Sequence, residues 1–97
     1  MKYEAAYREI ITDIMRTKVS LFGAAAVRRA RAIAGLQVND TGVVTELTGD
    51  PLTILSALLA SFEQLSGKIS TVSARTSVRR LGVRERYPDI ELPAGLC

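Results

Sequence analysis

The stretch Asp50–Gly67, DPLTILSALLASFEQLSG, carries the clearest helix signal in the chain. Asp50 is a good N-cap residue, and Pro51 stands at the first helical position, where its missing N–H costs nothing. The leucines and the phenylalanine that follow are spaced three and four apart, as one wide apolar helix face requires. Gly67 is the kind of residue at which helices end. The stretch therefore predicts a helix that faces a core.

The first third of the chain has the same helical period. Apolar residues between Tyr3 and Phe22 form a broad stripe, with acidic residues early and basic residues late, which suits the helix dipole. Gly23 interrupts the pattern, and helix-forming residues resume and continue to Gly35. Because a glycine inside a helix costs only about 1 kcal/mol relative to alanine, the sequence leaves open whether Gly23 separates two helices or bends one.

Between these helical regions the period changes. β-Branched residues flank the turn residues Asn39-Asp40-Thr41-Gly42, which predicts a short β-hairpin, or one strand with a turn. After Gly67 a weaker helix is expected from about residue 69 to Leu81, with Gly82 as its end. Residues 88–97 contain two prolines and have no helical period, so we expect an extended strap or a loose end.

Together these elements predict a mainly α fold. It has four short helices in two helix-Gly-helix pairs with a short β-hairpin between them, and it becomes α+β if the hairpin pairs across a dimer. We expect a single helical domain over residues 1–87 and an extended C-terminal tail over 88–97. Aligning Gly23 with Gly67 also aligns Leu21 with Leu65. Either the halves arose by duplication, or any such hairpin needs an apolar residue before its glycine.

Composition excludes several classes of protein. The 97 residues suffice for one thin, aliphatic core, and domains of this size often gain stability by self-association. The chain has no histidine and one cysteine, Cys97, so it cannot form an internal disulfide, a thiolate–imidazole zinc site or the usual nucleophile–base pairs. No apolar run is long enough to span a membrane. We expect a cytoplasmic protein that needs no cofactor and is not an enzyme.

Charge is distributed as basic, acidic and basic segments. The net charge is +3, and residues 36–65 contain four acids and no base. The arginines form one set before this acidic segment and another after it, and both sets are candidates for anion or nucleic-acid contact: Arg28, Arg29, Arg31, Arg75, Arg79, Arg80 and Arg84. The plainer interpretation is that these arginines lie on wet helix faces or pair with the acidic segment.

The preferred functional hypothesis is a non-catalytic protein-interaction or regulatory module that acts as a homo-oligomer. The helices have wide apolar arcs, and a chain of 97 residues has few other elements to cover them. We therefore expect part of this apolar surface to be buried against another copy or a protein partner. The residues expected at this interface are Ile10, Ile14, Leu55, Leu58, Leu59 and Phe62. The alternative is a nucleic-acid-binding protein that uses the arginine sets on the second and fourth helices.

Overall fold

The computed structural model describes residues 3–96; Met1, Lys2 and the single cysteine, Cys97, lie outside the described residues. The fold is mainly helical, with one short hairpin. Its elements are α1 (Glu4–Phe22), α2 (Ala24–Arg31), β1 (Leu36–Val38), β2 (Val44–Leu47), α3 (Pro51–Ser66), α4 (Ile69–Arg80), α5 (Val83–Arg86) and the 3-10 helix η1 (Ala94–Leu96). The predicted fold, two helix-Gly-helix pairs with a hairpin between them, is confirmed.

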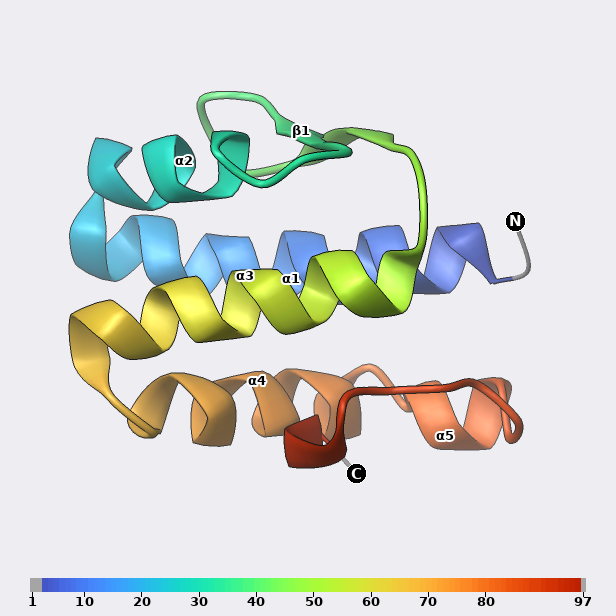
Figure 1. Ribbon diagram of the computed structural model, residues 1–97. Coiled ribbons are helices and arrows are strands. Elements are labelled where there is room, and N and C mark those ends of the chain that lie inside the picture. Colours follow the sequence, from blue (N-terminus) through green and yellow to red (C-terminus); the bar gives the residue numbers. More distant parts are fainter. Residues whose placement is uncertain (1–2, 97) are drawn as a thin grey trace.

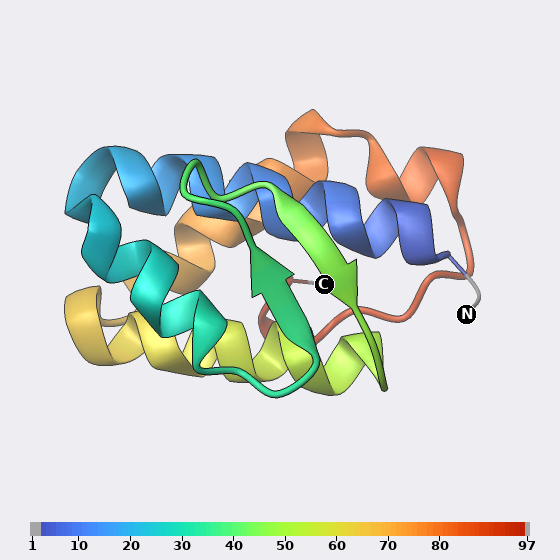
Figure 2. The ribbon, with the colours of Figure 1, turned by 90° about the horizontal axis from the view of Figure 1, so that it is seen from above.

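The helices stack in three layers (Figure 1). Helices α1 and α3 lie side by side in the middle, with α2 and the hairpin above them and α4, α5 and the C-terminal segment below. Viewed from above, the hairpin crosses over the middle layer beside α2 (Figure 2). Helix α1 packs on α2, α3, α4 and β2, so it forms the centre of the core.

Gly23 separates two helices, which settles the question that the sequence left open. Its backbone has φ 60° and ψ −137°, and its N–H donates to the Val19 carbonyl at 2.8 Å. Gly67 makes an equivalent turn, with φ 66°, ψ −158° and a bond of 2.8 Å to the Glu63 carbonyl. An L side chain rarely adopts such positive φ values, so glycine is the natural residue at both turns.

The hairpin is held by the helix beneath it. β1 and β2 pair antiparallel, with Leu36 opposite Leu47, and their apolar side chains are buried. In the turn, Asn39 Oδ1 accepts hydrogen bonds from the backbone N–H groups of Thr41 and Val43. The N–H of Val44 donates to Thr12 Oγ1 of α1 at 3.1 Å. Two strands alone are marginal in water, so this packing stabilises them.

Helix α2 is shorter than the sequence predicts. It ends at Arg31, whereas the helical pattern continues to residue 34. The chain must leave the helix here because the Gly35 carbonyl accepts a hydrogen bond of 2.8 Å from the Thr48 N–H, which closes the base of the hairpin. Tertiary pairing therefore overrides the local helix preference.

The C-terminal segment is a strap that packs on the core. Helix α5 was not predicted, and Ile90, Leu92 and Leu96 beyond it are buried. Tyr7 Oη donates a hydrogen bond of 2.5 Å to the Glu91 carbonyl, which joins the strap to the first turns of α1. Burial raises the pKa of the Tyr7 phenol, with a further contribution from the charge of Glu91. Residues 88–96 thus contribute to the same core as the helices.

Candidate anion-binding site

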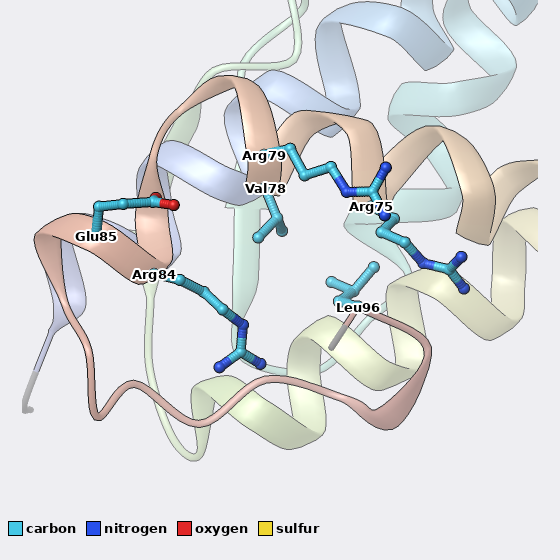
Figure 3. A pocket seen from close by; sticks show the side chains of 6 residues that line it. All are labelled: Arg75, Val78, Arg79, Arg84, Glu85 and Leu96. Atoms are coloured by element: carbon cyan, nitrogen blue, oxygen red, sulfur yellow. The ribbon is translucent and has the colours of Figure 1, made fainter.

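Three of the predicted arginines border one hollow on the lower layer of the molecule. Arg75 and Arg79 of α4 and Arg84 of α5 line it together with Glu85, and its volume is about 130 Å³. Val78 and Leu96 form an apolar floor (Figure 3). The hollow therefore combines positive charge at its rim with a small apolar surface beneath.

Local structure brings these arginines together. Arg75 and Arg79 are four residues apart on α4, so they lie on the same side of the helix. The chain turns at Gly82 into α5, and this turn places Arg84 on the other side of the hollow (Figure 3). Arg75 Nε donates to the Gly95 carbonyl of η1 at 3.1 Å, which fixes this side chain beside the strap.

Arg79 and Arg84 are free to bind an anion. Both side chains are exposed, and within residues 3–96 neither makes an ion pair or a hydrogen bond. The neighbouring Arg80 is different, since its guanidinium pairs with Asp13 of α1. Arg80, the remaining residue of the predicted C-terminal set, thus ties α4 to α1 and lies outside the hollow.

The N-terminal arginines have separate environments. Arg29 Nη1 donates to the Ser61 carbonyl of α3 at 2.9 Å, and Arg31 pairs with Asp40 at 3.0 Å. Arg28 is exposed, and its side chain has no partner within the described part of the chain. Helix α2 lies above the α1–α3 layer and α4 below it, so the two arginine sets do not share a face (Figure 1).

The acidic middle segment pairs with few of the arginines. Among the described residues, Arg31–Asp40 is the ion pair that joins this segment to the arginine sets. Arg80 and Arg86 pair instead with Asp13 and Glu9 of α1, and the Glu9 carboxylate raises the pKa of Arg86. The expected pairing of the middle segment with both sets is therefore limited to one contact, because α1 is the acidic element that faces α4 and α5.

The residues expected at an oligomer interface lie in the core of the single chain. None of them is more than 6% exposed: Ile10, Ile14, Leu55, Leu58, Leu59 and Phe62. The wide apolar arcs of α1 and α3 face each other and are covered by α2, the hairpin and α4. A folded chain consequently does not offer these side chains to a partner, and any self-association must use other residues.

Sequence reasoning missed two groups of residues. Lys18 is buried, although the sequence offered a sign in its helical spacing with Met15 and Phe22 on the apolar stripe. Five large apolar side chains of residues 3–96 are exposed instead of buried: Leu21, Val43, Leu65, Ile69 and Val72. Periodicity could not identify these, because it shows which residues share a face and not whether that face is covered.

Other kinds of site find little support in residues 3–96. No three His, Cys, Asp or Glu side chains come together there in a way that could hold a metal ion. None of the helices in this range is long and apolar enough to cross a bilayer. Comparisons with protein-family models, with curated proteins and with solved structures find no match.

Proposed function

We propose that this protein is a small, non-catalytic interaction module that binds an acidic segment of a protein partner at the hollow between Arg75, Arg79 and Arg84. The observation that carries the proposal is the free state of Arg79 and Arg84 beside an apolar floor. Of the other arginines of α4 and α5, Arg80 and Arg86 are already paired with carboxylates of α1, and Arg75 donates to the Gly95 carbonyl. The protein thus keeps two guanidinium groups available at one place.

The chemistry of the hollow favours carboxylates next to apolar side chains. A guanidinium group offers a planar fork that matches a carboxylate in a bidentate pair. Val78 and Leu96 supply an apolar surface on which a methyl or methylene group of the ligand can pack. Glu85 also lines the hollow, so its carboxylate repels a ligand carboxylate that approaches on its side.

Exposure of Arg79 and Arg84 also affects the rate of encounter. Exposed charges contribute little affinity individually, but they attract an oppositely charged partner and orient its approach. The affinity then comes from the apolar contact and from the pairs that lose water on binding. This division of roles suits a module that must bind and release its partner.

Nucleic acid is the less favoured ligand. Phosphate backbones need several cations along one surface, whereas α2 and α4, which carry the two arginine sets, lie on opposite sides of the α1–α3 layer (Figure 1). Phosphates also make no use of an apolar floor. The same experiment distinguishes the two ligand classes.

The test uses a fluorescent peptide of about eight alternating Glu and Leu residues, measured by anisotropy. We expect binding to the natural chain, and roughly tenfold weaker binding by each of the variants R79E and R84E. The matched control is R28E, because Arg28 is equally free but lies on α2. A Gln–Leu peptide of the same length should not bind.

Two results would overturn the proposal. The first is absence of peptide binding, and the second is an equal loss of affinity in R28E, which would indicate non-specific attraction. A short DNA duplex tested at about 50 mM and about 200 mM salt completes the comparison. Tight duplex binding that falls steeply with salt and is lost in R79E would favour nucleic acid as the ligand.

A further inference from the structure

Leu21 and Leu65 are exposed at equivalent positions in the two helix-Gly-helix turns. Each stands two residues before its glycine, and their side chains are 66% and 38% exposed. The explanation that such a hairpin needs an apolar residue to close it therefore does not apply, since neither leucine is buried. Another reason is needed for apolar residues at both places.

Two more exposed apolar residues lie beside the second turn. Ile69 and Val72 begin α4 and are 67% and 53% exposed. The turns at Gly23 and Gly67 lie at the same end of the bundle, as both ribbon views show (Figures 1 and 2). We call Leu21, Leu65, Ile69 and Val72 the turn-end patch. Clustered exposed apolar residues mark interaction sites more often than scattered ones do.

The border of the turn-end patch carries one free acid and one free base. Glu63 of α3 and Lys68 of the Gly67 turn line a hollow of about 310 Å³ together with Val72 and Arg75, and the Nε of Arg75 is already bonded to the Gly95 carbonyl. The side chains of Glu63 and Lys68 make no ion pair or hydrogen bond within residues 3–96. The patch is therefore apolar at its centre, and the charged side chains that line this hollow without a partner among the described residues are one acid and one base.

We propose that the turn-end patch binds the same patch of a second copy of this chain in a two-fold dimer. In a two-fold interface the same surface of both copies meets, and a contact from residue i of one copy to residue j of the other is repeated from j to i. The surface must therefore be complementary to itself. An apolar centre meets this requirement, and one acid with one base lets Glu63 of each copy pair with Lys68 of the other. An acidic partner would instead face Glu63, and a basic partner would face Lys68.

The dimer is separable from the proposed function. Arg79 and Arg84 do not belong to the turn-end patch, so R79E and R84E should leave self-association unchanged while they reduce peptide binding. A failure of the peptide experiment would leave the dimer prediction intact, and a monomeric protein would leave the peptide experiment intact.

Sedimentation velocity of the full chain, at about 1 to 200 µM, tests the apolar part of the interface. We expect the natural chain to shift from monomer to dimer over this range. I69E should remain monomeric, because its affinity for a second copy should be at least tenfold weaker. The matched control is V43E. Val43 is also exposed, at 37%, but it lies in the hairpin turn, outside the patch. Because both side chains are exposed, circular dichroism should show unchanged folding; L21S provides a second test if I69E is misfolded.

Charge reversal tests the two-fold arrangement. E63K and K68E should each weaken the dimer about tenfold, because like charges then face each other across the interface. The double variant E63K/K68E restores opposite charges and should return the affinity to within about threefold of the natural chain. A natural chain that stays monomeric at about 200 µM, or a V43E variant as impaired as I69E, would refute the dimer. A double variant no better than the single ones would refute the two-fold pairing.

Discussion

Lys18 Nζ donates a hydrogen bond of 3.0 Å to Ser70 Oγ inside the core, where α1 packs on α4. Lys18 is only 2% exposed, and its Nζ lies 5.7 Å from the centre of the Phe62 ring. Within residues 3–96 no carboxylate pairs with it. Burial without a counter-charge lowers the pKa of the Lys18 ammonium group.

We predict that Lys18→Met stabilises the protein by about 1–2 kcal/mol at neutral pH. Methionine fills the same volume without the cost of a buried charge. Ser70 keeps a partner in the variant, because its hydroxyl also donates to the Phe62 carbonyl at 3.1 Å. Urea denaturation should show a higher midpoint with an unchanged slope.

The advantage of Lys18→Met should shrink as the pH rises. The folded pKa of Lys18 lies below its ordinary value of 10.5, so between these values the unfolded chain binds more protons, and the natural protein gains stability as the pH approaches 10.5. Arg16→Met is the control, since Arg16 is exposed and should change stability by less than about 0.5 kcal/mol at any pH. A clear destabilisation by Lys18→Met would contradict this account.

The cap of α3 predicts a second pH effect. Asp50 accepts hydrogen bonds from the Thr53 hydroxyl and from the backbone N–H groups of Leu52 and Thr53, and these bonds lower its pKa below 3.8. The stability that Asp50 contributes is therefore present above pH 3.8 and lost as the pH falls through the folded pKa. Asp50→Ala should lower the melting temperature at pH 7, whereas Asp50→Asn should keep most of the cap and lose the acid dependence. Thermal scans from pH 7 to about pH 2 measure both effects.

Two glycines with similar positive φ values allow the cost of backbone strain to be measured apart from the cost of a steric clash. Gly35 has φ 87° and Gly49 has φ 91°, but a Cβ at Gly35 would meet the Thr48 carbonyl oxygen and the Ile54 side chain, while a Cβ at Gly49 would meet nothing within 4 Å. We expect Gly49→Ala to cost about 1 kcal/mol from the positive φ alone. Gly35→Ala should cost at least about 2 kcal/mol more, since the base of the hairpin must open. Equal losses in urea denaturation would show that the Thr48 contact is readily relieved.

The strap predicts a large effect from a residue near the end of the chain. Ile90 is buried against the core, so Ile90→Ala should lower the free energy of unfolding by about 2–4 kcal/mol. The neighbouring Glu91 contributes its backbone carbonyl to Tyr7 and leaves its side chain exposed, so Glu91→Gln should be almost neutral. A small effect of Ile90→Ala would mean that the strap contributes little to the core.

The sequence predicted the elements whose signals are local. The Asp50–Pro51 start of α3 and the Asn39–Gly42 turn each depend on neighbouring residues, and both were found where expected. The early end of α2 and the packing of Ile90 depend on hydrogen bonds and contacts between distant segments, which a local pattern does not contain.

The candidate site was predictable only in part. The four-residue spacing of Arg75 and Arg79 is visible in the sequence, but the approach of Arg84 depends on the turn at Gly82. The ion pair between Arg80 and Asp13, which keeps Arg80 out of the hollow, depends on how α4 packs on α1. The sequence predicts that part of the apolar surface of the helices is buried against a partner. In the structure Phe62 is buried beside Lys18, because neighbouring helices of the same chain cover this surface.

The bond between Tyr7 and Glu91 joins positions 84 residues apart in the chain. During translation the residues around Tyr7 are synthesised long before the strap. Until the strap is synthesised, one side of the apolar stripe of α1 stays uncovered. Contacts of such long range also slow folding, because most of the chain must be ordered before they form. The interval between the synthesis of α1 and the arrival of residue 91 is therefore the period when the nascent chain is most exposed to aggregation or to capture by a chaperone.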